Sequence, residues 1–263
     1  MPAVLRRAYR GAAGLALLFG AAQLALWAGR VDPSTFPLPS AVLGSAADLA
    51  GNGSFLASVG STMAVWAEAM VIAVVIGVLV GLLLGSLRFA ESALWPVFEF
   101  VRPVPAVVLV PLVLLIVQDD QRTEIAVVVF GCVWPVLINT IYGVRSVEPL
   151  ATETLRSFGF GPLAVARRVS LPSAAPFIAT GVRVAASFAF VVAVAVELVG
   201  TGMAGIGAFA AQEENGAADM AVMIAIAVWA GLIGIAVNFV FATAERRLFG
   251  WHFALAATAG GQE

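Results

Sequence analysis

The chain alternates between long apolar runs and short polar segments. Six of the runs approach or exceed the ~20 residues that a helix needs to cross the hydrocarbon core of a bilayer. The pattern therefore predicts an all-α membrane protein with six transmembrane helices, arranged as a single transmembrane domain over residues 1–263. The expected spans cover 12–29, 63–87, 93–117, 124–144, 175–199 and 219–244.

One polar segment, 145–174, is much longer than the other connections between spans. Its first half predicts a helix that begins at Pro149, because proline suits a first helical turn and apolar residues then recur at helical spacing. These apolar residues are Ala151, Leu155 and Phe158. A structured polar segment of this length in a membrane protein indicates contact with something outside the bilayer.

A second short helix is expected over 163–169. Two such helices lying across the membrane normal would form a projection that inserts into a groove on a soluble partner. The residues alone leave one alternative open, in which an amphipathic loop rests on lipid headgroups that attract Arg167 and Arg168.

Small residues and prolines distinguish the second and third spans. Gly77, Gly81 and Gly85 recur at every fourth position, which predicts a packing face that another helix approaches closely. The third span is irregular, and its prolines must be shielded by neighbouring helices or face a cavity. These prolines are Pro96, Pro103, Pro105 and Pro111. Short polar turns are expected at 88–92 and 118–123.

The composition excludes several classes of function. Hydrophobic residues make up 61% of the chain and charged residues 11%, with a mean hydropathy of +1.01. Cys132 and His252 are the only residues of their types, which excludes disulfides and metal clusters built on cysteine or histidine. All 14 basic residues are arginines, and a Walker A nucleotide-binding loop needs a lysine. We therefore expect no catalytic residue, metal or cofactor in this chain, and no nucleic-acid partner.

The arginines predict the orientation of the chain in the membrane. If there are six spans, ten arginines lie on the side of the two termini and of segment 145–174, and two lie on the other side. Because positive charge concentrates in cytoplasmic loops, both termini and segment 145–174 are predicted to be cytoplasmic. The ten are Arg6, Arg7, Arg10, Arg88, Arg145, Arg156, Arg167, Arg168, Arg246 and Arg247, and the two are Arg30 and Arg122.

Three charged residues inside the expected spans are candidates for a role in transport. Arg183 lies near the cytoplasmic end of its span, where we expect it to reach headgroups or bind loop carbonyls. Glu197 lies beside the glycine-rich stretch 200–207, and two roles are open for it: a cap on backbone N–H groups of that turn, or part of an outer gate. Arg102, on the third span, joins Glu197 as an expected residue of the translocation path.

Segment 145–174 also carries a spaced motif. It resembles the cytoplasmic signature of binding-protein-dependent ABC importer permeases, which reads E-A-A-x3-G-x9-I-x-L-P. The residues that match it in register are Glu153, Gly159, Leu171 and Pro172. The departures are Thr154 and Leu155 in place of the alanines, and Val169 in place of the isoleucine.

The resemblance extends over nearly all of the chain. The run that begins at Arg102 looks like the family's "R-P-I-P", Glu197 followed by Gly205 resembles its "A-E…G-I-G", and Glu245 followed by Trp251 resembles its "E-R…W" ending. The branch implied imports nitrate, sulfonates, taurine, aromatic acids or pyrimidine-like solutes. This chain departs from the branch after Val117, where it lacks a common glycine.

The resemblance implies a type I importer permease in the bacterial cytoplasmic membrane. The expected partners are a second permease chain, identical or homologous, a cytoplasmic ABC ATPase dimer that binds ATP and Mg²⁺, an extracytoplasmic solute-binding protein and the lipid bilayer. Segment 145–174 would transmit ATPase closure to the membrane helices. The residues expected to couple are Glu153, Leu155, Arg156, Phe158, Gly159, Phe160, Arg167, Leu171 and Pro172.

Two other classes of function are weighed against this interpretation. A secondary transporter or channel working alone would need an ion or proton relay, for which the carboxylates of Glu68, Glu99 and Glu197 offer weak support. A membrane enzyme is disfavoured because the sequence contains no paired polar cluster inside the spans. Copurification of an ATPase would distinguish the importer from both alternatives.

Overall fold

The computed structural model describes residues 3–27, 36–200, 202–215 and 219–259, and every regular element in these ranges is helical. The predicted all-α class is therefore confirmed for the described part of the chain. The α-helices are α1 (Ala3–Trp27), α2 (Pro39–Gly51), α3 (Gly53–Ser86), α4 (Arg88–Val101), α5 (Val110–Val117), α6 (Asp120–Arg145), α7 (Pro149–Ser157), α8 (Pro162–Val165), α9 (Leu171–Val199), α10 (Ile206–Asn215) and α11 (Met220–Ala259). A 3₁₀ turn, η1 (Ala106–Leu109), precedes α5, and a π-helical turn, η2 (Ala166–Ser170), precedes α9.

Several of these helices are long and apolar enough to cross a membrane. The described residues contain 4 such helices, or up to 5 if one bent pair is a single span. The four are Gly53–Ser86, Asp120–Arg145, Pro162–Val199 and Met220–Gly250. A membrane protein with several spans is thus confirmed, whereas the number six stays a prediction. The first expected span, 12–29, overlaps α1 and then runs into residues outside the described ranges.

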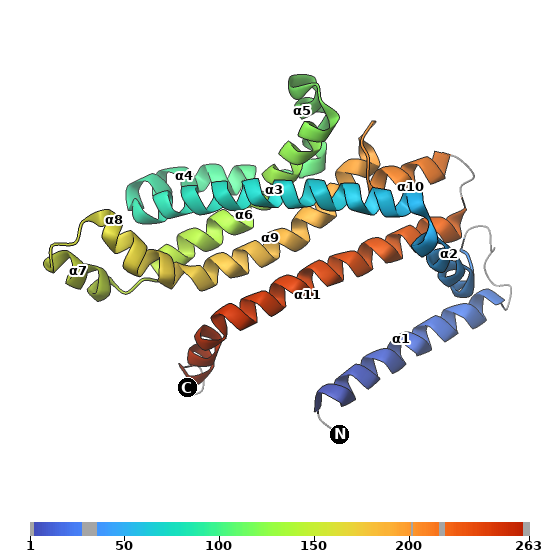
Figure 1. Cartoon of the computed structure of the whole chain (residues 1–263), viewed down its shortest axis with the longest axis horizontal. Helices are drawn as coiled ribbons and strands as arrows, with labels where there is room; N and C mark the ends of the chain where they lie inside the picture. The colour runs from blue at the N-terminus through green and yellow to red at the C-terminus, as the bar shows by residue number, and fades with distance from the viewer. Residues whose placement is uncertain (1–2, 28–35, 201, 216–218, 260–263) are drawn as a thin grey trace.

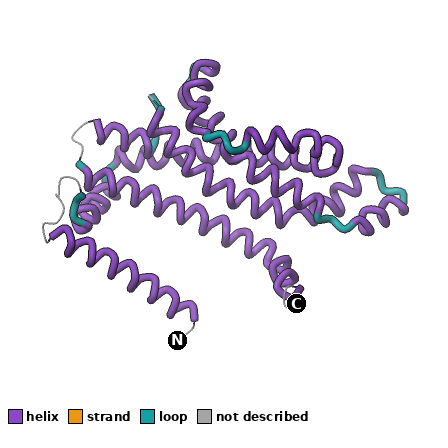
Figure 2. The backbone as a smooth tube through the Cα atoms, turned by 180° about the vertical axis from the view of Figure 1, so that it is seen from behind, coloured by secondary structure: helices purple, strands orange, loops and turns teal. Residues whose placement is uncertain are grey.

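Helices α3, α6 and α9 lie side by side and form the core of the bundle (Figures 1 and 2). The glycines of α3 face α6, as their spacing predicts. A Cβ added at Gly81 would lie 2.6 Å from the Cβ of Thr140, and one added at Gly77 would lie 2.8 Å from the Cβ of Val136. Only glycine lets the two helix backbones come this close, so the stripe is a packing face.

Glycines also allow the close packing of α6 against α9. A Cβ added at Gly143 would lie 3.0 Å from the Cα of Ala174, and one added at Gly181 would lie 2.8 Å from the carbonyl oxygen of Pro135. Glycines on α3, α6 and α9 thus place α6 in close contact with a helix on each side.

The expected third span, 93–117, is not one continuous helix. It is divided into Ala93–Val101 and Ala106–Val117, which are bent by 87° relative to each other. Pro103 and Pro105 explain the break, because each lacks an N–H donor and disfavours a helical conformation in the residue before it. The irregularity expected of this region is confirmed, and its assignment as one span stays a prediction.

The polar turns on either side of this region are shorter than predicted. Residues 88–92 belong to the first turns of α4, and the chain reverses at Leu87 instead. After α5, Gln118 takes a left-handed conformation with φ 54°, and Asp119 then caps α6 by accepting a hydrogen bond from the N–H of Arg122 at 2.8 Å. The predicted turn over 118–123 is thus confined to two residues.

The two ends of the bundle are built differently. Helices α7 and α8 lie at one end, and α2 and α10 lie at the other, from which α11 runs back along α9 (Figure 1). At the α10 end, the buried ring of Phe55 lies 5.5 Å from the ring of Phe209 and 6.4 Å from that of Trp229. The Trp229 indole N–H donates to the carbonyl of Ala46 at 2.9 Å, which ties α11 to α2.

Candidate functional site

Helix α7 protrudes at one end of the bundle and buries none of its residues. It ends in a glycine C-cap at Gly159, where φ is 81°. The N–H of Phe160 donates to the carbonyl of Leu155 at 3.1 Å, and the N–H of Gly159 donates to that of Arg156 at 2.9 Å. This pair of bonds, with a left-handed residue after the helix, satisfies carbonyls that would otherwise have no partner.

The residues expected to couple this segment to a partner lie mostly at its surface. The side chain of Phe158 is 77% exposed, and Leu163, which follows the C-cap, is 82% exposed. Leu155 and Phe160 are half-buried, and the Arg168 guanidinium lies over the Phe160 ring at 4.8 Å from its centre. The other expected residues, all exposed, are Glu153, Arg156, Gly159, Arg167, Leu171 and Pro172.

The second helix of the segment differs from the prediction. Instead of a separate helix over 163–169, helix α8, turn η2 and α9 form one continuous stretch, Pro162–Val199. The π-helical turn precedes Pro172, which cannot donate a hydrogen bond to the preceding turn. The expected loop 145–174 is therefore reduced to α7 and its two short connections, and Leu171 and Pro172 belong to the first turn of α9.

A cavity of about 460 Å³ separates α7 from the end of the bundle. Its lining includes Arg145, Thr152, Arg156 and Ser170. The main contacts of α7 are with α8 and η2, which are its neighbours in the chain. Helix α7 is thus attached through its ends more than through its faces, which leaves its surface available to another molecule.

At the opposite end, Glu197 is fully buried near the end of α9. Its Oε2 accepts a hydrogen bond from the N–H of Gly207 at 2.9 Å, and Thr62 Oγ1 accepts one from the N–H of Ile206 at 2.9 Å. These two side chains satisfy N–H groups at the start of α10. Of the two roles left open for Glu197, the structure shows the cap, while the gate is not tested by it.

Glycines make room for the Glu197 carboxyl group. Gly202 and Gly205 have φ values of 89° and 149°, which other residues rarely adopt. The Glu197 carboxyl lies directly against Gly205, so that any Cβ at that position would collide with it. The left-handed backbone at these glycines lets the turn before α10 pack directly against the Glu197 carboxyl, which caps the start of that helix.

Glu124 is a buried acidic residue that the sequence analysis missed. Its side chain is 2% exposed, and its carboxyl is close enough to that of Glu197 to interact with it directly. Glu124 was assigned only to the start of the span 124–144, next to a polar turn. A signal was present, because Asp120 and Glu124 are four residues apart and so share a face of α6.

The structure does not bring Arg102 together with Glu197. Arg102 is exposed at the C-terminal end of α4, where its N–H donates to the carbonyl of Phe98 at 2.9 Å. Glu197 is enclosed by α3, α6 and the turn before α10. Among the described residues, no hydrogen bond or ion pair joins Arg102 to Glu197, the two expected residues of the translocation path.

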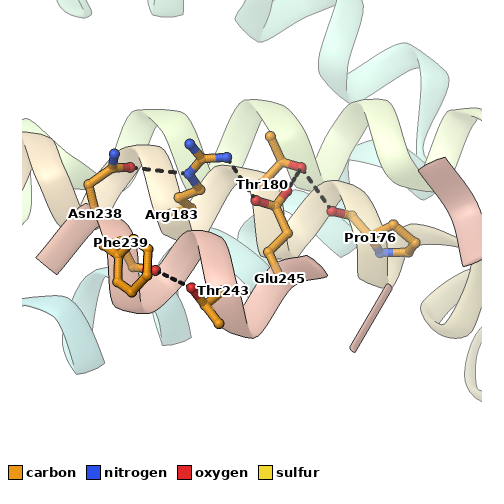
Figure 3. A network of polar contacts seen from close by, with 7 residues as sticks. All are labelled: Pro176, Thr180, Arg183, Asn238, Phe239, Thr243 and Glu245. Carbon is orange, nitrogen blue, oxygen red and sulfur yellow. Dashed lines mark hydrogen bonds and ion pairs between the residues drawn. The ribbon is translucent and has the colours of Figure 1, made fainter. Parts of the chain in front are cut away.

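Arg183 forms a polar network with α11 (Figure 3). Its Nη1 pairs with Glu245 Oε2 at 3.2 Å, and its Nε donates to Asn238 Oδ1 at 3.2 Å. The hydroxyl of Thr180 lies 2.5 Å from Glu245 Oε1. Glu245 is buried, so the expectation that Arg183 reaches headgroups or loop carbonyls is wrong. The network joins α9 to α11 across the bundle.

Comparison with protein families gives one match over most of the chain. Residues 73–250 match the family described as "Binding-protein-dependent transport system inner membrane component". The matched range runs from α3 to α11 and includes α7, Glu124 and Glu197.

Curated relatives are similar over shorter stretches. The chain is 35% identical over 119 residues to the bicarbonate transport system permease protein CmpB of Synechocystis sp., covering 45% of this chain and 42% of that protein. It is 32% identical over 147 residues to the nitrate import permease protein NrtB of Leptolyngbya laminosa, covering 56% and 52%. The chain thus spans about half the length of these relatives. A probable ABC transporter permease of Brucella melitensis is 28% identical over 215 residues, covering 82% and 87%.

Solved structures share the fold. The chain resembles a chain of the MetNI methionine ABC transporter, seen in an inward-facing conformation, with a TM-score of 0.65 and 19% identity. The alignment covers 74% of this chain and 95% of the other. An amino acid ABC transporter gives a TM-score of 0.58, also at 19% identity, with 73% and 93% covered.

Proposed function

Because the chain belongs to the family of binding-protein-dependent transport system inner membrane components, we propose that it is the permease subunit of an ATP-driven ABC importer. It forms part of the path across the membrane, and a separate subunit binds and hydrolyses ATP. The absence of lysine from the sequence supports this division, since no Walker A loop can form in the chain.

The observation that carries the proposal is the exposed helix α7. A short helix with apolar side chains at its surface, held at the polar end of a membrane bundle, suits insertion into a groove on another protein. The exposure of Phe158 and Leu163 gives that groove apolar contacts, and Arg156 and Arg167 supply charge. The partner we assign to this surface is the cytoplasmic ATPase dimer.

The remaining partners follow from the family name and from the arginine distribution. A solute-binding protein delivers the substrate at the α10 end of the bundle, which is the extracytoplasmic end if α7 is cytoplasmic. A second permease chain, identical or homologous, completes the path. The protein resides in the cytoplasmic membrane with both termini in the cytoplasm.

The proposed substrate is a small inorganic anion of the nitrate or bicarbonate type. The curated relatives are named for these two ions, whereas the residues of this chain do not distinguish them from sulfonates or aromatic acids. Arg102 is assigned to the translocation path, because it is a basic residue exposed beside the bend between α4 and η1. Glu197 organises the outer turn and does not select the anion, which it would repel.

Two variants at the α7 end test the proposal. Phe158→Asp places a charge on the exposed apolar surface, and Ser146→Asp places the same charge on an exposed residue just outside α7. Both are expected to insert and fold, because neither side chain is buried. In copurification from membranes that contain the cognate ATPase, Phe158→Asp loses the ATPase and Ser146→Asp retains it. Equal recovery of the ATPase with both variants would contradict the assignment of α7.

A transporter that works alone is the second candidate. The buried carboxyls of Glu124 and Glu197 favour it, because an ion or proton relay would need such groups. Uptake of nitrate or bicarbonate by liposomes that contain only this chain, without ATP, would support that candidate. Uptake that requires the ATPase and ATP would exclude it.

A further inference from the structure

A small cavity opens at the α10 end of the bundle, between α3, α6 and the turn that follows α9. Its volume is about 230 Å³. Polar and acidic groups contribute much of its lining, which includes Ser61, Asp120, Gln121, Glu124, Gly202 and Ala204. Gln121, Gly202 and Ala204 are exposed, so the cavity communicates with the surface.

One of the lining side chains is buried, lies against the carboxyl of Glu197, and has one oxygen without a hydrogen bond to any described residue. Glu124 is 2% exposed, and its Oε1 makes no hydrogen bond among the described residues. Beside it, Glu197 is fully buried, and its Oε1 also lacks a partner in the described part of the chain. An ionised carboxylate without a counter-charge is strongly unfavourable when it is removed from water. Each of these carboxyls must therefore either carry a proton or have a cation bound beside it.

The nearest basic residue on α6 cannot serve as that cation. Arg122 is exposed and lies two positions from both Asp120 and Glu124, and residues at that spacing do not face each other on a helix. The α6 N-terminus contributes only about +0.5 of an elementary charge. Part of that is already used by Asp119, which caps the helix.

We propose that this cavity binds a small inorganic cation of the sodium type, held by oxygen ligands. The carboxylates of Glu124 and Asp120, with the neutral oxygens of Gln121 and Ser61 that line the same cavity, are the hard ligands that such ions prefer. The described residues contain no group of three His, Cys, Asp or Glu that could hold a metal ion, so the proposed site relies on two carboxylates and on neutral oxygens. The bound ion balances the charge of Glu124 and joins α6 to the turn that Glu197 caps.

Cation binding in this cavity does not depend on which solute is imported, and it can be measured without the ATPase or the binding protein. The full chain is reconstituted in lipid nanodiscs, and binding of ²²Na⁺ is measured by flow dialysis with K⁺, Li⁺ and Ca²⁺ as competitors. Wild type is compared with Glu124→Gln, Asp120→Asn and the control Glu213→Gln. Glu213 is a carboxylate of α10 at the same end of the bundle, and it does not line the cavity.

Saturable binding of about one ion per chain is expected for wild type and for Glu213→Gln. Glu124→Gln should abolish it, and Asp120→Asn should weaken it about tenfold, as changes around metal sites commonly do. If Glu124→Gln does not fold, the partly exposed Asp120→Asn variant decides the question. The proposal is overturned if wild type binds none of the four ions saturably, which would assign the charge balance to protons. It is equally overturned if a folded Glu124→Gln or Asp120→Asn binds like wild type.

Discussion

The carboxyl group of Glu197 fits closely against the backbone of two glycines at the α10 end of the bundle. It accepts a hydrogen bond from Gly207 and lies directly against the backbone of Gly205. A buried N–H that lost this acceptor would cost about 1–3 kcal/mol. The carboxyl and the glycine are therefore required together, because a side chain at position 205 would displace the cap.

Gly205→Ala is expected to destabilise the protein by about 1–3 kcal/mol, since the added Cβ collides with Glu197 and the φ of 149° is unfavourable for alanine. Thermal unfolding in detergent measures the effect. Gly231→Ala is the control, because no atom lies within 4 Å of a Cβ at that helical position. The control should unfold at or slightly above the wild-type temperature. A Gly205→Ala variant as stable as the control would show that the turn is not fixed by this contact.

At the scale of elements, α7 and the α9–α11 pair are held by different interactions. The start and end of α7 depend on local features, a proline in its first turn and a glycine after its last. The α9–α11 pair depends on Arg183 and Glu245, which are 62 residues apart in the chain. Changes at these two places should therefore have different effects, on function in the first case and on stability in the second.

Gly159→Asp is expected to uncouple transport while the protein remains inserted and folded. A residue other than glycine in the left-handed conformation costs about 1–2 kcal/mol, and open space surrounds the position, so the change is confined to the end of α7. Substrate-stimulated ATP hydrolysis by the reconstituted importer should fall several-fold.

Gly161→Asp is the matched control for that variant. It adds the same charge two residues away, where φ is −69° and aspartate is a favourable residue at the N-cap of α8. Its ATP hydrolysis should remain close to wild type. Equal loss with both variants would mean that charge, and not the backbone at Gly159, is responsible.

Arg183→Ala is expected to destabilise the protein by about 3 kcal/mol, the lower end of the range for a broken buried pair, because Arg183 is partly exposed. The double variant Arg183→Met/Glu245→Leu removes both charges and should recover most of the loss. Chemical unfolding in detergent compares the single and double variants. Additive losses in the double variant would show that the pair contributes nothing through its charges.

Local features were predictable from the sequence and contacts between distant segments were not. The helix that begins at Pro149 was identified from spacing and a first-turn proline, and the glycine stripe of α3 from its period. The continuity of α8 with α9 was missed, because glycine and proline signals suggested a break that the π-helical turn avoids. Glu124 was missed because Glu197, the carboxyl next to it, is brought there only by the packing of α6 against α9.

At the scale of the whole molecule, the described helices leave large apolar surfaces uncovered. Helix α1 lies apart from the bundle, and hydrogen bonds between Gln23 and Ser40 join it to α2 (Figure 1). Leu115 and Ile116 on α5 are 76% and 73% exposed. Lipid and a second permease chain are the surroundings that we propose for these surfaces.

The orientation of the molecule predicts which residues can be labelled from each side of the membrane. Single cysteines at Arg167 and Gln212, both exposed, should react from the cytoplasm and from outside respectively. Cys132 is fully buried, so its background labelling should be low, and Cys132→Ser provides the reference. Reaction with a membrane-impermeant maleimide in intact and inverted vesicles distinguishes the sides. Labelling of both positions from the same side would reject the topology.

The continuous stretch Pro162–Val199 also has a mechanical consequence. Its 38 residues form a rod roughly 57 Å long at 1.5 Å per residue, with α7 attached to one end and the Glu197 carboxyl near the other. Because this helix is continuous, a displacement or rotation of its α7 end is transmitted along its own backbone to the Glu197 end, without relying on a chain of side-chain contacts. The π-helical turn and Pro176 interrupt its regular hydrogen bonding near the α7 end, so we expect bending or twisting of the helix under a push on α7 to concentrate there.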